Sequence, residues 1–364
     1  MRLLIAGGGT GGHLFPGIAV AEELLSRGKE HAVLFAGTDR GLEARVLPPL
    51  GLPFATVRAG GVVGAGLAGT LRALTLLAAG TVDAARVLRR FQPTACLGVG
   101  GYVSFPVVAL AWVRRIPTAI QEQNARPGLA NRVLARLAGA VYAGDPAAVR
   151  HLPGAKVRVT GNPLRRALAS ALPYAPPEHG QPARLLVLGG SQGARVLNEL
   201  LPAAVDALGA PVSVWHQAGR GRAEAVAETY GNREGVRVAE FIEDMAGAYG
   251  WAHLVVARAG ALTVAELAAA GRPAVLVPFP HAAGGHQAAN ARAAEDRGAA
   301  VTALEAGLTP AHLAELLRAL LGSAERLNAM AAAAAASARR DAAKTIVDDL
   351  LQREGRRPAP GATP

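Results

Sequence analysis

Five of the six residues at positions 7–12 are glycines, and His13 follows them directly. Because glycine has no side chain, a bound anion can approach the backbone amides of such a turn closely. Histidine titrates near neutral pH and can act as a general base. The combination predicts a loop that holds a phosphate beside a proton acceptor. The alternative is a tight turn that only packs a helix on a sheet, with His13 hydrogen-bonded to the loop.

A second glycine-rich turn occurs in the middle of the chain. The segment ARLLVLGGSQGARVLNELLPAAV, residues 183–205, combines an apolar run, a glycine turn and an amphipathic helical pattern. Ser191 lies in this turn, where its hydroxyl could join backbone amides in binding a phosphate. The alternative is an ordinary helix N-cap. Because the order of apolar run, glycine turn and helix at the N-terminus is repeated here, an anion-binding role is favoured for both turns.

Polar residues near two later helix starts could bind a sugar or a ribose. Glu266 lies one turn inside the helix predicted from RAGALTVAEL, where it could accept both ribose hydroxyls or only compensate the helix dipole. Gln287 and Asn290 are three residues apart and share one helix face. Amides both donate and accept hydrogen bonds, which suits sugar hydroxyls, although a solvated helix face would have the same pattern.

The elements that must position these residues alternate between strand and helix. We expect strands near 3–6, 32–36, 95–99, 117–121, 140–143 and 157–160, and again near 183–188, 212–217, 236–239, 253–257 and 274–277. This alternation predicts an α/β fold with doubly wound, mainly parallel sheets. Because the plan restarts after the proline-rich segment 161–183, we expect two Rossmann-like domains facing across a cleft, with both glycine turns at strand carboxyl ends.

The expected domain bounds follow from this repeat. The N-terminal domain covers 1–163 and the C-terminal domain covers 164–334, and a C-terminal helix at about 335–352 is expected to rejoin the first domain. One alanine-rich helix is expected over about 324–351. The tail, 355–364, is rich in proline and glycine and is expected to be disordered.

Composition narrows the class of protein. The chain has 364 residues, 51% of them hydrophobic, a net charge of +11 and a single cysteine, Cys96, which excludes an internal disulfide. The positive charge suits phosphorylated substrates or an anionic membrane surface, and no basic tail or motif favours nucleic acid. No secretory signal or long apolar span is visible, so we expect the protein to remain on the cytoplasmic side.

One region combines apolar, aromatic and basic residues in the manner of a membrane attachment site. The segment VVGAGLAGTLRALTLLAAG, residues 62–80, precedes RVLRRF at 86–91, and Trp112 precedes Arg114 and Arg115. These are the parts of a peripheral attachment to anionic lipid. The alternative is a core helix with a solvated basic end.

The first turn also matches the dinucleotide fingerprint GxGxxG formally, so a nicotinamide-dependent dehydrogenase must be considered. That fingerprint requires an acid at the end of the second strand, but Asp39 comes some residues late, beyond Gly37 and Thr38. No residue set for hydride transfer accompanies it. A protein that binds a nucleotide sugar without catalysis is the other rival, and two anion-binding turns with a candidate base argue against it.

Eight segments together resemble one family, the MurG family of bacterial lipid I N-acetylglucosaminyltransferases, over about residues 1–350. They are GGTGGH (8–13), GVGGYVSFP (98–106), QEQN (121–124), GNPLR (161–165), GGSQGAR (189–195), EFIEDM (240–245), GALTVAEL (260–267) and HQAANA (286–291). The resemblance implies a GT-B fold with two Rossmann-like domains. It also implies transfer of N-acetylglucosamine from UDP-N-acetylglucosamine to the muramoyl 4-hydroxyl of undecaprenyl-diphosphate-linked lipid I, with inversion, giving lipid II of peptidoglycan.

The resemblance also implies roles for residues at matching positions. For the donor these are Ser191 at the diphosphate, Ile242 at the uracil, Ala261, Leu262 and Thr263 at the phosphate, Glu266 at the ribose, Gln287 and Asn124 at the sugar, and Arg165 in the donor region. Thr10, Gly11 and Gly12 would lie where donor and acceptor meet. The acceptor diphosphate would lie on Gly100, Gly101, Tyr102 and Ser104, with His13 as the candidate catalytic base.

Other implications concern cofactors, partners and location. No DxD motif is present, so we expect no metal and no other cofactor in the site. Expected partners are the two substrates, an anionic membrane surface at the cytoplasmic face of the plasma membrane, and other proteins of cell-wall synthesis. Two departures from the family pattern stand out: Gly284 and Gly285 replace an acidic pair, and Gln121 stands where histidine is common.

Overall fold

The chain forms two compact units of α/β structure. The computed structural model describes residues 1–39, 41–60, 67–153, 156–168, 173–178, 180–190 and 192–355, with the backbone alone for 67–74 and 283. Unit 1 comprises Met1–Arg165 and Asp341–Pro364, and unit 2 comprises Arg166–Arg340.

Unit 1 contains a seven-stranded sheet in the order β3-β2-β1-β4-β5-β6-β7, and its paired strands are parallel. The strands are β1 (Arg2–Gly7), β2 (Ala32–Gly37), β3 (Phe54–Thr56), β4 (Ala95–Gly100), β5 (Thr118–Glu122), β6 (Ala140–Ala143) and β7 (Val157–Val159). The expected strands of the first half are confirmed. The edge strand β3 was not predicted, because three partly exposed residues leave no apolar run to detect.

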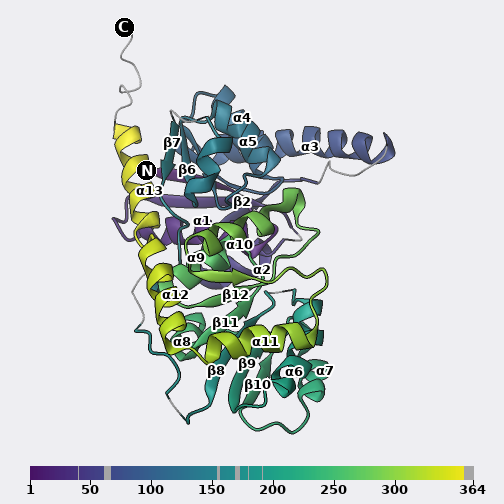
Figure 1. The fold of residues 1–364 in the computed structure, drawn as a ribbon. Helices are drawn as coiled ribbons and strands as arrows, with labels where there is room; N and C mark the ends of the chain where they lie inside the picture. The colour runs from purple at the N-terminus through teal and green to yellow at the C-terminus, as the bar shows by residue number, and fades with distance from the viewer. Residues whose placement is uncertain are drawn as a thin grey trace. The chain divides into compact units, whose positions relative to one another are not determined.

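Helices cover both faces of this sheet, and β1 shows why. Leu3 and Ile5 pack on one face, whereas Leu4 and Ala6 pack on the other. The first face is covered by α1 (Gly11–Leu25) and α13 (Ala342–Gly355), and the second by α3 (Leu67–Phe91), α4 (Ser104–Val113) and α5 (Leu129–Leu137) (Figure 1). A strand that is buried on both faces has a continuous apolar sequence, and LLIA in β1 is such a sequence. Short helices α2 (Glu43–Val46), η1 (Pro48–Leu50) and η2 (Pro146–His151) lie in the connections.

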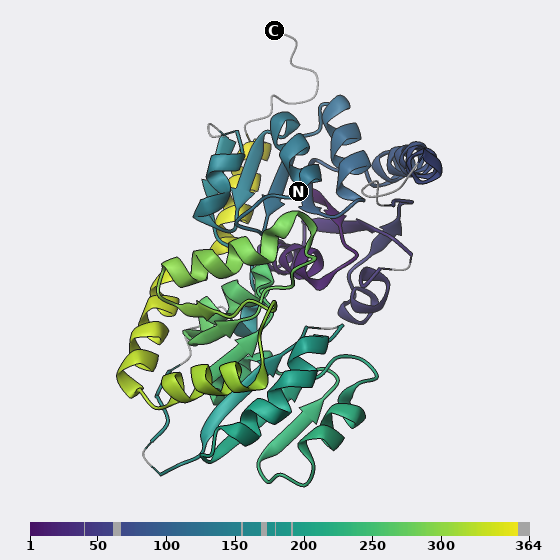
Figure 2. The same cartoon turned by 45° about the vertical axis from the view of Figure 1, so that its right-hand side comes forward.

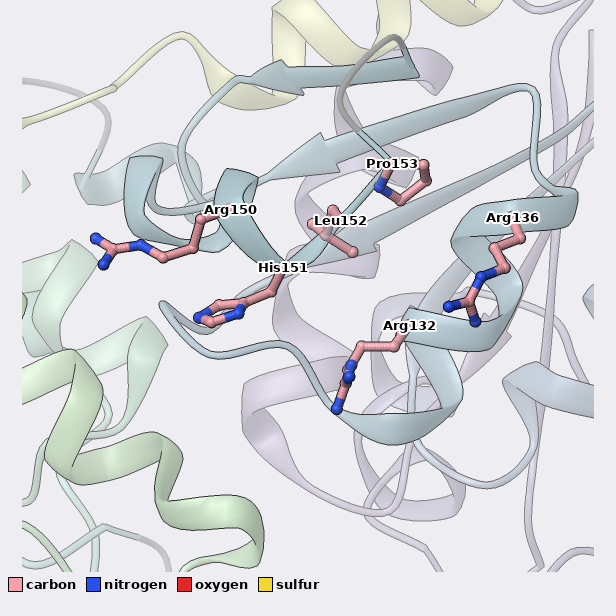
Figure 3. A pocket seen from close by; sticks show the side chains of 6 residues that line it. All are labelled: Arg132, Arg136, Arg150, His151, Leu152 and Pro153. Carbon is pink, nitrogen blue, oxygen red and sulfur yellow. The ribbon is translucent and has the colours of Figure 1, made fainter.

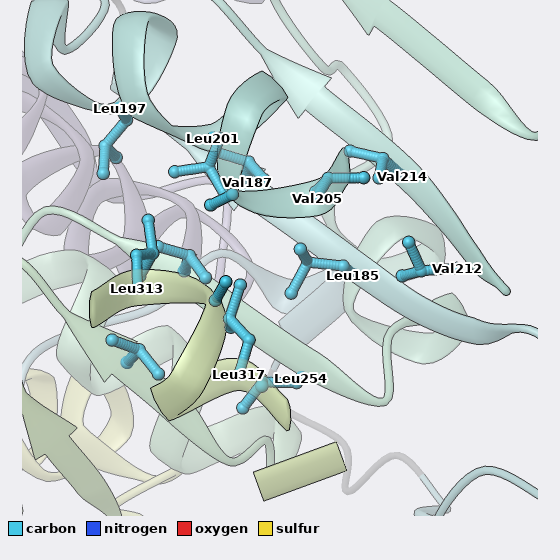
Figure 4. Close-up of a cluster of buried hydrophobic side chains, with 14 of the residues drawn as sticks. Leu185, Val187, Leu197, Leu201, Val205, Val212, Val214, Leu254, Leu313 and Leu317 are labelled. Carbon is cyan, nitrogen blue, oxygen red and sulfur yellow. The ribbon is translucent and has the colours of Figure 1, made fainter. Parts of the chain in front are cut away.

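Unit 2 repeats the plan with six strands in the order β10-β9-β8-β11-β12-β13. Its elements are β8 (Ala183–Leu188), α6 (Arg195–Ala207), β9 (Val212–Gln217), α7 (Ala223–Tyr230), β10 (Val236–Ala239), α8 (Met245–Trp251), β11 (Leu254–Ala257), α9 (Ala261–Ala270), β12 (Ala274–Leu276), α10 (His286–Asp296), β13 (Ala300–Thr302), α11 (Pro310–Leu321) and α12 (Ala324–Ser337), with η4 (Arg166–Leu168) and η5 (Ala283–Gly285). Figures 1 and 2 show α6 and α11 side by side over this sheet. Their leucines interlock with strand residues such as Leu185 and Val214 (Figure 4).

Each sheet reverses its strand order once, and these switch points locate the binding sites. In unit 1 the reversal lies between β1 and β4, and in unit 2 it lies between β8 and β11. Ligands of doubly wound sheets bind outside the carboxyl ends of the strands at such a point. Both glycine-rich turns, after β1 and after β8, therefore lie where this fold binds its ligands.

The C-terminal region differs from the single helix expected over 324–351. The structure has two helices there, because Ala338 adopts an extended conformation and ends α12. The Arg340 guanidinium donates to the Ala269 carbonyl, with Nη2 2.7 Å from the oxygen, and this anchors the break on unit 2. The chain then enters α13 of unit 1. Of the tail 355–364, all but Gly355 lies outside the described residues.

A buried ionic cluster fastens α13 to unit 1. Asp349 is buried and accepts hydrogen bonds from the Tyr142 hydroxyl (2.7 Å) and from Nε of Arg353 (2.7 Å), and it also pairs with Arg158. Burial raises the pKa of Asp349, but the hydrogen bonds and the two positive charges outweigh burial and hold the pKa below its usual range. The folded state therefore favours the ionised carboxylate.

This cluster makes stability depend on pH in the acid range. A depressed folded-state pKa gives stability that is complete above the unfolded-state value, about 3.9, and is lost as the pH falls through the folded-state value. We expect the difference in unfolding free energy between wild type and Asp349→Asn to shrink when urea denaturation is moved from about pH 7 to about pH 3. A difference that stays constant over this range would contradict the assignment.

Candidate active site

The two glycine-rich loops of unit 1 lie against each other at the switch point. A Cβ on Gly7 would lie 2.4 Å from the carbonyl oxygen of Gly100, and one on Gly101 would lie 2.8 Å from that of Gly8. Gly7, Gly100 and Gly101 also have positive φ values, +147°, +98° and +83°. Only glycine meets both demands, so the motifs GGTGGH and GVGGYVS form one continuous surface.

Ser104 holds this surface together from below. It is fully buried, accepts a hydrogen bond from the Gly100 amide (3.0 Å), and its hydroxyl lies 2.7 Å from the carbonyl oxygen of Ala6. We therefore assign Ser104 a supporting role, in place of the direct diphosphate contact that the resemblance implies. Tyr102, in contrast, is 57% exposed and is presented to solvent beside the glycine backbone.

His13 lies in the first turn of α1, at the edge of the same surface. Its Nδ1 is 3.3 Å from Oγ1 of Thr10, and its ring lies over Gly100, where a Cβ would be 2.7 Å from Cδ2 of the histidine. Thr10 is the N-cap of α1 but makes no side-chain cap, so the amides of Gly11 and Gly12 at the helix start keep their capacity for an anion. The predicted proton acceptor and the predicted anion site are thus brought together within unit 1.

Glu43 is a site residue that the sequence analysis missed. Its side chain is fully buried and accepts hydrogen bonds from the Gly9 amide (2.9 Å) and the Thr38 amide (2.6 Å). The acid of a dinucleotide fingerprint would instead be used for ribose hydroxyls. Here Asp39 is exposed, and the Glu43 carboxylate is used by the amides of Gly9 and Thr38, so Glu43 supports the turn and does not replace the missing ribose acid. This arrangement does not match the fingerprint of a nicotinamide nucleotide site in unit 1.

The QEQN segment is held at the carboxyl end of β5 by a second buried acid. Glu122 accepts hydrogen bonds from the backbone amide of Asn124 (2.8 Å), from its side-chain amide (3.0 Å) and from Asn131 (2.9 Å). Burial raises the pKa of Glu122, although these hydrogen bonds oppose the shift. Asn124, predicted to contact the sugar, therefore has a fixed orientation.

Gln121 and Arg165 extend this support. Gln121 is buried and donates to Oδ1 of Asn162 (2.8 Å). The residue that stands here in place of histidine therefore has a supporting position below the surface of the site. Arg165 stacks over the ring of Phe15, 4.6 Å from the centroid. Because a Cβ on Gly11 would touch Phe15 (3.0 Å), this stacking holds the guanidinium beside the first turn of α1.

The turn of unit 2 is built on the same principle as that of unit 1. Gly190 and Gly193 have φ values of +78° and +73°, and a Cβ on Gly193 would lie 2.2 Å from the Ala218 carbonyl oxygen. The N-cap of α6, Ala194, makes no side-chain cap, which leaves the amides of the helix start for an anion. Ser191, the predicted diphosphate contact, lies outside the described residues.

A chain of buried polar groups supports this turn and was not predicted. The side-chain amide of Asn198 donates to the Ala218 carbonyl (3.0 Å), so its oxygen accepts from Nε2 of His216 (3.1 Å). Nδ1 of His216 then accepts from the Tyr230 hydroxyl (3.0 Å). Burial lowers the pKa of His216 to about 4, which keeps the ring neutral in this tautomer. The carbonyl against which Gly193 rests is thereby fixed in place.

The start of α9 supplies the second half of the unit 2 switch point. Its N-cap is Gly260, which makes no side-chain cap, and Ala261, Leu262 and Thr263 form its partly exposed first turn. Glu266 follows one turn later, is only 8% exposed, and accepts a hydrogen bond from the Tyr249 hydroxyl (3.0 Å). A buried, oriented carboxylate near an open helix start suits the recognition of vicinal hydroxyls.

Two amides secure the loops that follow β11 and β12. Asn290 donates to the Ala259 carbonyl (3.1 Å), and Gln287 accepts from the Phe279 amide (2.9 Å) through its oxygen. Because the Gln287 oxygen accepts this hydrogen bond, its side-chain nitrogen is the atom that would donate to the predicted sugar. Gly284 and Gly285 have φ values of +63° and +68°, in the left-handed region that glycine adopts without strain.

Ile242, the predicted uracil contact, lies in the loop after β10. It is buried, and its amide donates to Oε1 of Gln217, 3.2 Å away. Gln217 is the last residue of β9 and is itself buried. The Gln217 side chain thus anchors the loop that carries Ile242, and it is a further residue that sequence reasoning missed.

The predicted membrane-facing residues are exposed on adjacent helices of unit 1. Trp112 and Val113 at the end of α4 are 47% and 65% exposed, and Arg114 and Arg115 follow them. Arg89 and Arg90 are exposed at the end of α3, which packs beside α4. The residues 62–66 lie outside the described part. Among the helices that the structure describes, none has the length and apolarity needed to cross a bilayer.

Taken together, these features define a class of protein. Two Rossmann-type units, each with a glycine turn and a helix start without a side-chain cap at its switch point, form an architecture that two-domain glycosyltransferases use. Within the described ranges, no three His, Cys, Asp or Glu side chains gather in a possible metal site.

Comparison with known proteins gives the family. The models of the glycosyltransferase family 28 N-terminal and C-terminal domains match residues 3–143 and 184–346. The UDP-N-acetylglucosamine–N-acetylmuramyl-(pentapeptide) pyrophosphoryl-undecaprenol N-acetylglucosamine transferase of Anaeromyxobacter dehalogenans is 48% identical, over 98% of this chain and 94% of its own. The protein of the same name from Myxococcus xanthus is 45% identical, over 96% of this chain and 92% of its own.

Solved structures agree with these relatives. The crystal structure of Acinetobacter baumannii MurG is 34% identical with a TM-score of 0.79, and the match covers 97% of this chain and 99% of that one. The chain therefore belongs to glycosyltransferase family 28 and, within it, to the MurG family of N-acetylglucosamine transferases. The expected two-domain GT-B fold is confirmed.

Proposed function

We propose that this protein transfers N-acetylglucosamine from UDP-N-acetylglucosamine to the 4-hydroxyl of the muramoyl sugar of lipid I, and so forms lipid II. The observation that carries this proposal is 48% identity, over nearly the whole chain, to a relative named for that transfer. The site residues of this chain supply the chemistry that the reaction needs. They do so from two separate units.

Unit 2, Arg166–Arg340, is the proposed donor-binding domain, for which the sequence analysis expected the bounds 164–334. The diphosphate contacts the turn around Ser191 and the first turn of α9, at Ala261, Leu262 and Thr263. Glu266 accepts the ribose hydroxyls, Ile242 contacts the uracil, and Gln287, with Asn124 of unit 1, contacts the sugar. Arg165 adds positive charge. As negative charge grows on the departing diphosphate, these fixed dipoles stabilise it without reorganising.

Unit 1 is the proposed acceptor domain, with the expected bounds 1–163 and the C-terminal helix. The backbone of Gly100 and Gly101, with Tyr102, contacts the lipid diphosphate, while Ser104 supports the loop. The acceptor oxygen attacks the anomeric carbon from the face opposite the diphosphate, which inverts that centre. His13 takes the hydroxyl proton, and UDP leaves with the bonding electron pair. Thr10, whose Oγ1 is 3.3 Å from Nδ1 of His13, helps to orient the imidazole at the surface of the two glycine loops.

A transfer assay separates this proposal from a nonenzymatic sensor. The protein is incubated with UDP-N-acetylglucosamine, with and without a short-chain lipid I analogue, and release of UDP is followed. We expect rapid release only when the acceptor is present. Binding of the donor without any acceptor-dependent release would support a sensor and contradict the proposed reaction.

We further propose that the protein works as a peripheral protein at the cytoplasmic face of the plasma membrane, where its lipid acceptor and other cell-wall synthesis proteins are found. Replacing Arg89, Arg90, Arg114 and Arg115 by glutamine should reduce co-sedimentation with anionic vesicles, because each basic residue near such a surface contributes about 1 kcal/mol. Activity on a soluble acceptor should persist. Unchanged co-sedimentation at physiological salt would place the attachment surface elsewhere.

The site is proposed to work without a metal or another cofactor. Helix dipoles and loop amides at the two switch points supply the positive potential that a cation would otherwise give. Transfer to a soluble acceptor should therefore keep its rate after exhaustive chelation. Activity that is lost with a chelator and restored by magnesium or manganese would contradict this prediction.

A further inference from the structure

A basic pocket in unit 1 lies apart from the loops assigned to the substrates. It has a volume of about 390 Å³ and is lined by Arg132, Arg136, Arg150, His151, Leu152 and Pro153. Figure 3 shows Arg132 and Arg136 extending from α5, with His151 of η2 on the side of Arg132, while the Arg150 side chain extends away from these residues. The segments that carry them are α5, which leads into β6, and the connection from η2 toward β7, so the pocket lies beside β6 and β7.

The charge of this pocket is uncompensated. No acidic residue lines it, and within the described residues none of the three guanidinium groups has an ion pair. Arg132 and Arg136 are one helical turn apart, a spacing at which like charges repel each other. Eight other arginines of the described chain, in contrast, pair with carboxylates. Guanidinium groups that line a pocket without a carboxylate partner favour the binding of an anion there.

The chemistry of the lining selects the kind of anion. Guanidinium groups present a planar set of donors that matches the oxygens of a phosphate and can bind two of them at once. Leu152 is nearly buried and, with Pro153, gives the pocket an apolar wall. The volume is in the range of pockets that hold small ligands. A phosphate group with a small organic substituent meets all three conditions.

We propose that this pocket binds a phosphate group on a molecule other than the two substrates. Its source is either the headgroup of an anionic phospholipid or a soluble phosphate compound, since both present the same oxygens. None of the lining residues belongs to the loops 7–13, 98–104 or 121–124, so the proposal does not depend on the proposed reaction.

The test uses the full chain and a matched pair of variants. Inorganic phosphate is titrated by calorimetry into wild type, into Arg132→Gln/Arg136→Gln, and into Arg326→Gln/Arg339→Gln. The control pair removes the same charge from exposed arginines of unit 2. We expect phosphate binding to weaken on the order of ten- to a hundredfold in the pocket variant, and to stay unchanged in the control variant. Thermal unfolding checks that both variants are folded.

Two further measurements distinguish the sources and the sites. Vesicles of phosphatidylcholine with phosphatidylglycerol should compete with phosphate if the source is a lipid headgroup, whereas pure phosphatidylcholine vesicles should not. Absence of competition assigns the pocket to a soluble phosphate compound. Transfer to a soluble acceptor should keep its KM and kcat in the pocket variant. No phosphate binding to wild type, equal binding in both variants, or a raised acceptor KM would each overturn the proposal.

Discussion

Replacement of His13 by alanine is expected to lower the turnover number by roughly 10²–10⁴-fold, the usual contribution of a positioned general base. His13 lies beside Thr10 and over Gly100, at the surface formed by the two glycine loops of unit 1. In the proposed reaction the imidazole acts only when the acceptor hydroxyl begins to attack, so its loss should affect the transition state and not the bound donor. The affinity for UDP-N-acetylglucosamine should therefore change little.

The pH dependence separates catalysis from loop support. A base must be deprotonated to act, so wild type should lose activity on the acid side, and the alanine variant should lack this acid limb. Steady-state kinetics from about pH 5.5 to 9 measures it. Thr10→Val is the matched control, because it removes only the hydroxyl that faces Nδ1. An acid limb that persists in the alanine variant, with weaker acceptor binding and lower thermal stability, would mean that His13 only holds the loop.

Replacement of Glu266 by alanine should weaken UDP-N-acetylglucosamine binding by about ten- to a hundredfold. Hydrogen bonds to a charged group contribute on the order of 1.5–3 kcal/mol, and about 1.4 kcal/mol corresponds to a factor of ten. Glu266 is buried and oriented by the Tyr249 hydroxyl at 3.0 Å, so its carboxylate needs no reordering to meet a ribose. Calorimetric titration of donor and 2'-deoxy donor gives both affinities.

The 2'-deoxy donor makes this prediction specific. Wild type should prefer the natural donor, whereas Glu266→Ala should bind the two donors nearly equally. Tyr249→Phe removes the supporting hydroxyl but keeps the carboxylate, so it should retain a preference. Equal binding of both donors by wild type would contradict the ribose assignment.

Much of the fold could be predicted, because it depends on local patterns. Buried parallel strands have continuous apolar sequences. The runs LLIA and LLVL therefore predict β1 and β8 directly. The three-residue strands β3 and β13 lack such runs and were missed. The break between α12 and α13 was also missed, because it is set by contact of Arg340 with Ala269, 71 residues away. Alanine-rich sequence alone favours one continuous helix there.

The residues proposed to contact a ligand could be selected from the sequence more easily than the residues that support them. Glycine turns, His13 and Glu266 carry their chemistry in their own residue types. Glu43 was not predicted, because its role comes from an amide 34 residues away. The same holds for His216, whose partners Asn198 and Tyr230 come from two different helices. These supporting contacts join residues that are far apart in the sequence, so no local periodicity or motif predicts them.

The central claim is tested most directly by the product made from a defined acceptor. The protein is given UDP-N-acetylglucosamine with a soluble lipid I analogue, and in parallel with the same analogue lacking the muramoyl 4-hydroxyl. Mass spectrometry and proton NMR then identify any product. The account predicts one added N-acetylglucosamine in β linkage on the first acceptor and no transfer to the 4-deoxy acceptor. Transfer to the 4-deoxy acceptor, or an α linkage, would contradict it.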